Sequence, residues 1–287
     1  MLPYDGMTRT GSKGVSHCPG LVAPGQTPSE ARKVLERRGK SKLLCRPGRL
    51  LLYCGAGHSR NDTYKVMERE MQNMEQARFN MIEQQIRPCD VLEGRILELL
   101  KHVRREQFVP AGMKELAFAD MEIPLGHGAS MWQPKLEARV VQELHLARSD
   151  KVLEVGTGSG YLTALLSALA GHVTSVEIVL ELSAQAGQNL AALQRDNITL
   201  EVGDAATGWG NGTYDAIVLT GSTPVLPEAF RNSLNVGGRL FAIVGDAPAM
   251  EAKLITRVAS DIFETVNIME TSVAPLRNAA QPERFVF

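Results

Sequence analysis

The segment Val152–Tyr161, which reads VLEVGTGSGY, constrains the fold of this chain more than any other. An apolar strand leads directly into Gly156, Gly158 and Gly160. A helical pattern follows at Tyr161–Ala170. Glycines at such a junction let the backbone turn sharply, and the free N–H groups of the helix N-terminus favour anionic ligand groups. The segment therefore predicts a strand, loop and helix that bind a ligand at the carboxyl edge of a sheet.

Beyond Asp150, short apolar runs alternate with helical stretches. Continuous apolar strands joined by crossover helices are typical of a parallel sheet that is covered on both faces. We therefore predict an α/β fold with a doubly wound, mostly parallel sheet. Strands are expected at Lys151–Val155, Val173–Ile178, Ile198–Val202, Ala216–Leu219 and Arg239–Val244, and further helices at Leu180–Leu193 and Pro227–Asn235. The strand-like ends Phe263–Met269 and Arg284–Phe287 suggest an antiparallel pair at the sheet edge.

Residues 71–149 predict a helical N-terminal region that includes a substrate loop. A first helix is expected from Met74, with its apolar face at Phe79, Ile82 and Ile86. A second helix is expected after Pro88, a third after Pro134, and a glycine-rich loop between them at Asp120–Gln133. The apolar face of the second helix starts at Leu92, with Asp90 and Glu93 spaced as in a capping box.

Charge divides the chain at about residue 70. Residues 1–70 carry 13 Lys and Arg against 6 Asp and Glu, whereas residues 71–287 carry 18 against 26, which gives +7 and −8 and the net charge of −1. Such a basic, Gly- and Pro-rich segment buries little apolar surface, so we expect a mostly disordered or non-native leader. Met71 and Met74 are candidate alternative starts. The other interpretations are a nucleic-acid-binding arm, a targeting peptide or a zinc site at Cys45 and Cys54.

The composition also limits the compartment and the partners. The acidic body holds one cysteine, Cys89, so an internal disulfide framework is excluded there and a reducing cytoplasm is expected. No apolar run approaches the ~18 residues that span a bilayer, so we expect no membrane partner. The nearly balanced charge favours no nucleic acid. We expect no metal site, and a monomer or weak dimer.

Carboxylates after neighbouring strands indicate the class of ligand. Glu154 and Glu177 fall at or near the carboxyl ends of successive expected strands, and Asp204 follows the third in a GDA turn. Glu177 is placed to accept from two ribose hydroxyls, and Asp204 from an adenine amine. Carboxylates suit a cationic sulfonium better than a pyrophosphate, which they would repel. The second and third glycines are also one residue closer than in a dinucleotide fingerprint, so a nicotinamide-dependent oxidoreductase is the weaker alternative.

These residues resemble class I S-adenosylmethionine-dependent methyltransferases. More narrowly, residues 74–287 resemble the protein-L-isoaspartate O-methyltransferase family through PLGHGASMWQP, VLEVGTGSGYLTALLSAL, GDA, YDAIVLTGS and NVGGRLFAIVG. The resemblance implies a seven-stranded sheet with the last strand antiparallel, and methyl transfer to the isoaspartyl carboxylate of a damaged protein or peptide for repair. It implies S-adenosyl-L-methionine at Glu154, Gly156, Thr157, Gly158, Gly160, Glu177, Asp204 and Ala205. Ala205 stands where glycine is common in the family.

The substrate loop departs from the family pattern. Trp132 stands where the family has a functionally important serine, and Ala129 stands where it has a glutamine. The catalytic candidates are therefore Ser130, two residues earlier, and Trp132 itself. The indole adds apolar, stackable surface, so a small aromatic or apolar acceptor is an alternative to a damaged protein. A non-catalytic cofactor-binding protein is another, and His127 is a candidate base only for a hydroxyl acceptor.

Overall fold

The computed structural model describes residues 44–46, 49–51 and 60–282, with side chains from Glu68 onward. The chain divides into two compact units, residues 1–65 and residues 66–287. The first unit contains an antiparallel pair, β1 (Leu44–Arg46) and β2 (Arg49–Leu51). The disorder expected of the leader, and the alternative zinc site in it, fall outside the described residues and side chains.

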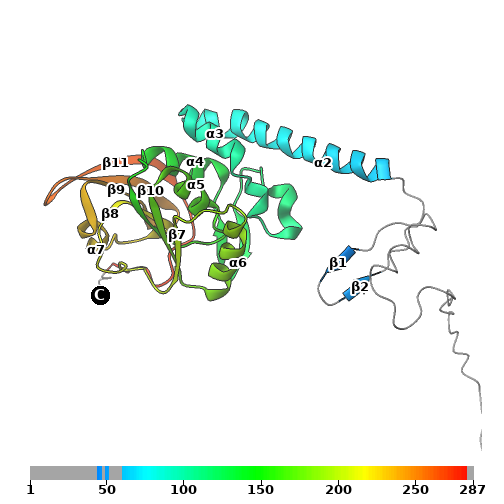
Figure 1. The fold of residues 1–287 in the computed structure, drawn as a ribbon. Coiled ribbons are helices and arrows are strands. Elements are labelled where there is room, and N and C mark those ends of the chain that lie inside the picture. Colours follow the sequence, from blue (N-terminus) through cyan, green and yellow to red (C-terminus); the bar gives the residue numbers. More distant parts are fainter. Residues whose placement is uncertain (1–43, 47–48, 52–59, 283–287) are drawn as a thin grey trace, which may run out of the picture. The chain divides into compact units, whose positions relative to one another are not determined.

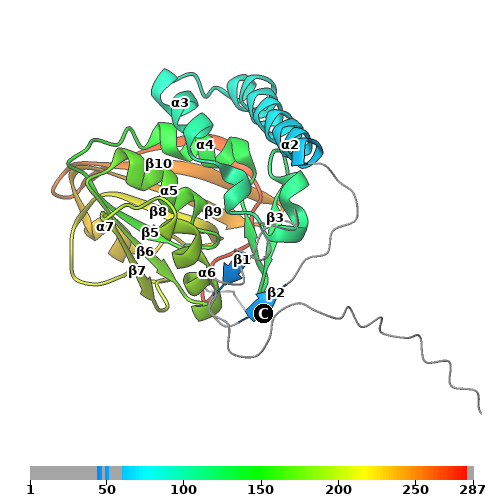
Figure 2. The same ribbon diagram turned by 45° about the vertical axis from the view of Figure 1, so that its right-hand side comes forward.

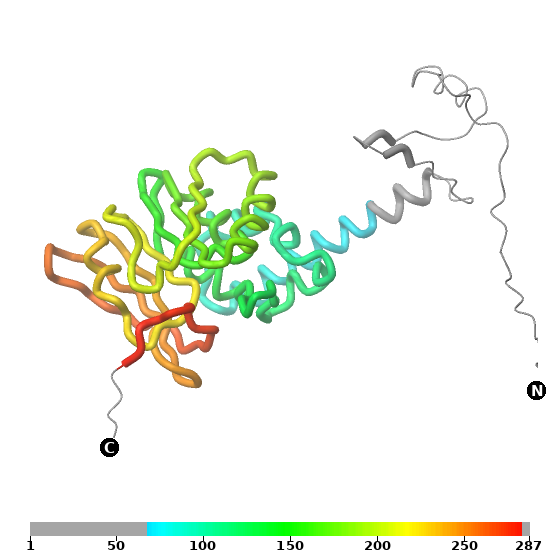
Figure 3. Tube along the Cα trace, turned by 90° about the horizontal axis from the view of Figure 1, so that it is seen from below, coloured from blue at the N-terminus to red at the C-terminus, as the bar shows by residue number. Residues whose placement is uncertain are grey.

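The second unit is built around one seven-stranded sheet (Figure 1), and Figure 3 follows the course of the same chain from below as a tube. Its strand order is β11, β10, β9, β8, β5, β6, β7. The strands are β5 (Lys151–Val155), β6 (His172–Glu177), β7 (Ile198–Val202), β8 (Tyr214–Thr223), β9 (Leu234–Asp246), β10 (Ala249–Ala259) and β11 (Ile262–Thr271). The first five are joined in parallel, which confirms the doubly wound, mostly parallel sheet.

The end of the sheet differs from the expectation. Strand β10 pairs antiparallel with both β9 and β11, so the reversed strand is the sixth and not the last. The antiparallel pair at the edge is the β10–β11 hairpin, and Arg284–Phe287 lies outside the described residues. The run Ala249–Ala259 is missing from the predicted strands because Glu251, Lys253, Thr256 and Arg257 interrupt its apolar residues.

Alternation along each strand separates two cores. In β5, Val152 faces one core while Leu153 and Val155 face the other. The first core lies under helices α4 (Pro134–Glu143) and α5 (Tyr161–Leu169), and the second under α7 (Glu228–Asn232). Helix α6 (Leu180–Ala191) joins β6 to β7 and contacts α5 (Figure 2). Coverage of both faces leaves the loops at the carboxyl ends of the strands free to form a site.

The N-terminal helices differ in detail from the prediction. Helix α2 (Arg60–Met81) continues as a π-helix, Ile82–Ile86, and α3 spans Gly94–His102. Phe79 is 52% exposed, because the buried stripe of α2 runs one residue earlier through Arg78, which pairs with Glu106. Leu92 is also exposed and precedes α3. The predicted capping box is wrong, because the N-terminus of α3 has no side-chain cap. Among the described residues, no helix is long and apolar enough to span a membrane.

The expected glycine-rich loop contains a small hairpin. Strands β3 (Ile123–Gly126) and β4 (Ala129–Met131) pair antiparallel. His127 and Gly128 make the turn with φ values of +54° and +75°. Glycine adopts the left-handed conformation without strain, and tight hairpin turns commonly place their central residues there. We call residues 123–132 the acceptor hairpin, because they contain Ser130 and Trp132, the two candidates of the expected substrate loop.

Candidate functional site

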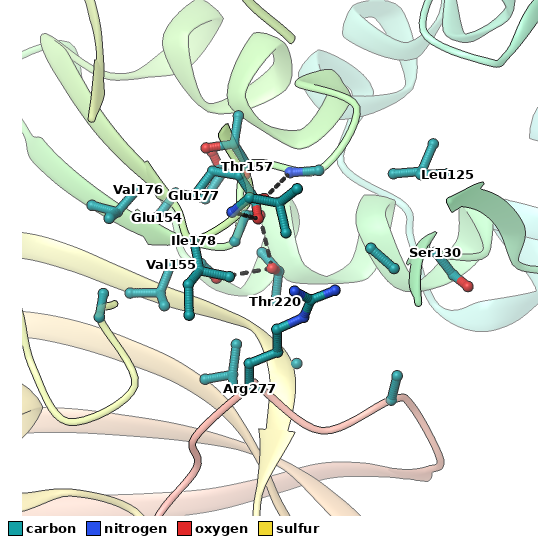
Figure 4. Close-up of a pocket in the computed structure, with 18 of the residues that line it drawn as sticks. Leu125, Ser130, Glu154, Val155, Thr157, Val176, Glu177, Ile178, Thr220 and Arg277 are labelled. Atoms are coloured by element: carbon teal, nitrogen blue, oxygen red, sulfur yellow. Dashed lines mark hydrogen bonds between the residues drawn. The ribbon is translucent and has the colours of Figure 1, made fainter. Parts of the chain in front are cut away.

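A pocket opens where the parallel strands end, between three kinds of segment. Loops after β5, β6, β7 and β8 form one end, and the acceptor hairpin forms the other. Residues 274–277, which follow β11, close one side (Figure 4). Nine of the ten predicted site residues line it: Ser130, Trp132, Glu154, Gly156, Thr157, Gly158, Glu177, Asp204 and Ala205. Gly160 does not line the pocket, because it caps α5 and packs against Leu190.

The glycine-rich turn is held from the next strand of the sheet. Thr220, at the carboxyl end of β8, donates to the carbonyl oxygens of Val155 and Gly156, with Oγ1–O distances of 2.8 Å in a shared interaction. Gly156 has a φ of +96°, and a Cβ atom there would collide with the Thr220 hydroxyl. Only glycine therefore allows this approach. Sequence reasoning missed Thr220, although it lies in the quoted YDAIVLTGS segment.

Glu154 lies beneath this turn and is fully buried. Its Oε2 accepts hydrogen bonds from Thr163 in α5 at 2.5 Å and from Ser175 in β6 at 2.6 Å, and Ser175 also contacts the Thr157 hydroxyl at 2.6 Å. Burial raises the pKa of Glu154 to about 7, an effect opposed by the hydrogen bonds from Ser175 and Thr163. The other oxygen, Oε1, has no hydrogen-bond partner among the described residues. Glu154 therefore supports the residues around the turn through Oε2, and it lines the pocket with Oε1 still unpartnered among the described residues.

Glu177, at the end of β6, joins the glycine-rich turn to the start of α6. Its Oε2 accepts from the Gly158 N–H at 2.8 Å, and its Oε1 accepts from the Val179 N–H at 3.1 Å. The carboxylate is nearly buried and lines the pocket. Each oxygen keeps a free lone pair, so the carboxylate can still accept from ligand hydroxyls.

Asp204 and Ala205 follow β7 and line the same end of the pocket. Asp204 Oδ1 accepts from the Ala206 N–H at 3.0 Å, and Oδ2 accepts from the Asn278 amide at 2.7 Å. The second bond ties the segment after β11 to the GDA turn, a link that the sequence did not indicate. Ala205 is buried and has no positive φ, so its methyl group fits this turn without backbone strain.

The acceptor hairpin is anchored by a buried arginine that sequence analysis did not single out. Arg105 donates to the Trp132 carbonyl at 2.5 Å and to the Ala117 carbonyl at 2.8 Å, and it pairs with the buried Glu137. Its guanidinium lies 5.1 Å from the centre of the Tyr161 ring. Burial lowers the pKa of Arg105 to about 10, which keeps it charged at neutral pH. The Trp132 side chain is 6% exposed and packs into the first core while lining the pocket.

The polar residues of the acceptor hairpin have separate placements. Ser130 lines the pocket beside Glu122. Burial raises the pKa of Glu122, and a hydrogen bond from Ser130 opposes this effect. His127 is exposed in the turn and is not among the pocket-lining residues, and its carbonyl accepts from Arg277. The His127 ring is therefore not placed in the pocket as a base.

The sequence model of one family matches most of the second unit. This family is described as protein-L-isoaspartate(D-aspartate) O-methyltransferase, and the match covers residues 76–281. A protein-L-isoaspartate O-methyltransferase from Rhodopseudomonas palustris (strain ATCC BAA-98 / CGA009) is 38% identical over 208 residues, 71% of this chain and 95% of that protein. A second, from strain HaA2, is 37% identical over 201 residues, 69% of this chain and 82% of that protein.

Solved structures share the fold at lower identity. A Plasmodium falciparum protein, described as a protein-L-isoaspartate O-methyltransferase in complex with S-adenosyl-L-homocysteine, superposes with a TM-score of 0.58 at 19% identity. The superposition covers 69% of this chain and 96% of that one. Another structure described as a protein-L-isoaspartate O-methyltransferase has a TM-score of 0.60 at 21% identity over 70% of this chain and 65% of its own.

Proposed function

Because the chain belongs to the protein-L-isoaspartate(D-aspartate) O-methyltransferase family, we propose that it transfers a methyl group from S-adenosyl-L-methionine to the isoaspartyl carboxylate of damaged proteins. The observation that carries the proposal is the convergence of Glu154, Glu177 and Asp204 with the glycine-rich turn at one end of a single pocket. We place the activity in a reducing cytoplasm, in keeping with the single cysteine of the acidic body, Cys89. We also propose a monomer or weak dimer that uses neither membrane nor nucleic acid.

The pocket residues fit this cofactor on structural grounds. The turn at Gly156 brings the backbone to the pocket wall, which a Cβ atom would prevent. Glu177 keeps lone pairs for the two ribose hydroxyls, and Asp204 with Ala205 offers an acceptor and an apolar surface to the adenine. Glu154 has a buried Oε1 without a partner, on the side where the amino acid part of the cofactor would bind. The ribose, the adenine and the amino acid part of the cofactor therefore each have a complementary residue in the pocket.

Methyl transfer to a carboxylate requires the protein mainly to orient the two reactants. When bound, S-adenosylmethionine supplies an electrophilic methyl group on a sulfonium, which an ionised carboxylate attacks without giving up a proton. The pocket therefore needs no general base, which agrees with the place of His127 outside it. Alignment of two bound reactants can supply roughly 7 kcal/mol or more of the rate enhancement. Rigid walls such as the Arg105-anchored acceptor hairpin provide such alignment.

A labelled-methyl assay on an isoaspartyl peptide tests the proposal. The expected result is a base-labile methyl ester on that peptide and none on a matched peptide with an ordinary aspartate. Adenosylhomocysteine binding, measured by calorimetry on the same preparation, reports the cofactor site separately. Intact adenosylhomocysteine binding without ester formation would refute repair activity but not the cofactor assignment. No adenosylhomocysteine binding would refute both.

One observation favours a second candidate acceptor. Trp132 presents an indole to the pocket at the family's serine position, beside the apolar Leu125 and Met131. These side chains suit a small aromatic or apolar acceptor. Labelled transfer onto a protein-free small-molecule extract, run beside the peptide assay, decides between the two. Label found only in the extract would show that the acceptor is a small molecule and not a damaged protein.

A further inference from the structure

The pocket has an unbalanced set of charges for an anionic acceptor. Five carboxyl groups line it, at Glu122, Glu137, Glu154, Glu177 and Asp204. Glu137 is neutralised by its ion pair with a buried arginine, and Glu154 has a pKa raised to about 7. The remaining carboxylates repel an isoaspartyl carboxylate as it approaches. A cation of the protein, in addition to the sulfonium of the cofactor, would therefore favour an acceptor of this charge.

Arg277 is the one lysine or arginine among the described residues that line the pocket. Its backbone is fixed by the sheet, because Ser222 N–H donates to the Ala274 carbonyl at 3.0 Å and Leu276 N–H donates to the Ser222 carbonyl at 2.9 Å. In Figure 4 the Arg277 side chain extends from the segment after β11 into the pocket, on the side of Thr220. The cation is thus held by a rigid backbone at the pocket wall.

The guanidinium also belongs to the acceptor end. Its Nη2 donates to the His127 carbonyl in the turn of the acceptor hairpin, and a Cβ atom at Gly128 would lie 4.0 Å from the same nitrogen. Among the described residues, His127 is the only hydrogen-bond acceptor that Arg277 contacts. Four of the five guanidinium N–H donors therefore remain for another group.

The hairpin has lost a donor at the same end. The family's serine hydroxyl is replaced by Trp132, whose side chain is packed in the core, and the loop glutamine is replaced by Ala129. A guanidinium binds a carboxylate through two parallel N–H donors, which fixes its plane as well as its place. Arg277 offers this geometry where the hairpin side chains do not.

We propose that Arg277 binds the acceptor carboxylate and sets the preference of this enzyme for an anionic acceptor. The inference rests on the proposed function, because it assigns the group that recognises the isoaspartyl carboxylate. The guanidinium compensates the carboxylates of the pocket and orients the acceptor oxygen. In this chain the acceptor carboxylate is therefore bound from the segment after β11 and not by a side chain of the hairpin.

Peptide binding in the presence of adenosylhomocysteine tests this role without turnover. Two peptides are compared by calorimetry, one with an isoaspartyl residue and one in which the same carboxylate is a primary amide. We expect the wild-type protein to prefer the carboxylate at least 10-fold, Arg277→Ala to lose most of this preference, and Arg277→Lys to keep part of it. Arg148→Ala removes the same charge from an exposed site outside the pocket and should keep the full preference.

The outcomes separate this inference from the proposed function. An unchanged preference in Arg277→Ala overturns the role of Arg277. Weaker adenosylhomocysteine binding in Arg277→Ala also overturns it, because the guanidinium would then serve the carboxylate of the cofactor. A wild-type protein that binds adenosylhomocysteine but neither peptide refutes the proposed function, and the inference falls with it.

Discussion

The two ends of the pocket are built in different ways. The cofactor end uses residues that follow consecutive strands of one sheet, and Glu177 and Thr220 bind their neighbours through backbone groups at 2.8–3.1 Å. The acceptor end joins the hairpin at residues 123–132 to a segment about 150 positions later, through Arg277 and the His127 carbonyl. Its support is one buried arginine, Arg105, which comes from neither segment.

This difference explains which end tolerates change. At the cofactor end, Glu177 and Thr220 also bind backbone groups of the loops that shape the site, so a substitution there disturbs that backbone. At the acceptor end, Arg277 both faces the pocket and binds the hairpin backbone, but the Trp132 side chain faces the pocket without holding any backbone group. The Trp132 backbone is held separately, because Arg105 binds its carbonyl while its indole faces the core and the pocket. Acceptor preference can therefore change while cofactor binding is kept.

The largest expected effect comes from the support of the acceptor end. Arg105→Met leaves Glu137 buried without a counter-charge, which costs about 3–5 kcal/mol of unfolding free energy. Urea unfolding measures this loss. The double variant Arg105→Met with Glu137→Met should recover much of it, and Arg104→Met, at an exposed neighbour, should cost less than about 0.5 kcal/mol. A loss below 1 kcal/mol in Arg105→Met would show that the pair does not support the hairpin.

The next effect concerns pH and the cofactor end. Glu154 has a usual pKa of 4.5 and a folded pKa of about 7, so the unfolded chain releases this proton first as pH rises. Glu154 therefore lowers stability progressively between pH 4.5 and 7, by up to about 3 kcal/mol, and the contribution is constant above that range. Urea unfolding of Glu154→Gln should lack this part of the slope. Identical slopes for both proteins would show that Glu154 ionises normally.

Glu177 tests the cofactor end by ligand affinity. Glu177→Ala removes the acceptor of two backbone N–H groups and the acceptor that we propose for both ribose hydroxyls. We expect adenosylhomocysteine binding to weaken about 100-fold, or ~2.7 kcal/mol, by calorimetry. Glu181→Ala, at an exposed position in the first turn of α6, is the matched control. Equal affinities for wild type and Glu177→Ala would remove Glu177 from the cofactor site.

The smallest effect is expected from removing residues that belong to neither end of the pocket. We propose that a chain beginning at Met71 keeps its fold and cofactor affinity, because the described side chains from Glu68 to Asn73 are exposed. Its thermal midpoint should shift by less than about 2 °C. A chain beginning at Ile82 is the contrast, since it also lacks Met81 and Arg78, which are buried. Unfolding of the chain from Met71 would show that earlier residues are structural.

Local patterns made the cofactor end predictable. An apolar strand, a glycine-rich turn and the start of a helix are all encoded within VLEVGTGSGY, and β5 and α5 lie where that pattern places them. The predicted residues other than Gly160 meet at one pocket because parallel strands end at one edge of the sheet. Gly160 was assigned from its spacing, which does not distinguish a helix cap from a pocket wall.

The acceptor end depends on contacts between distant residues. Arg277 and Asn278 acquire their places from the β10–β11 hairpin, whose second strand was predicted and whose first strand was not. Arg105 sits in a polar stretch, REQ, that reads as exposed until its partner Glu137 is placed beside it. Phe79 was assigned to a buried face because a hydrophobic period cannot register a buried Arg78. In each case, tertiary pairing overrides the local pattern.

The anchoring of Trp132 by its carbonyl has an evolutionary consequence. Every amino acid has that carbonyl, so the hydrogen bond from Arg105 places no demand on which residue occupies position 132. A single codon change there alters the pocket wall at the acceptor end, while the backbone keeps its course. Substitutions at position 132 of this chain can therefore change the acceptor one at a time, provided that Arg105 is kept.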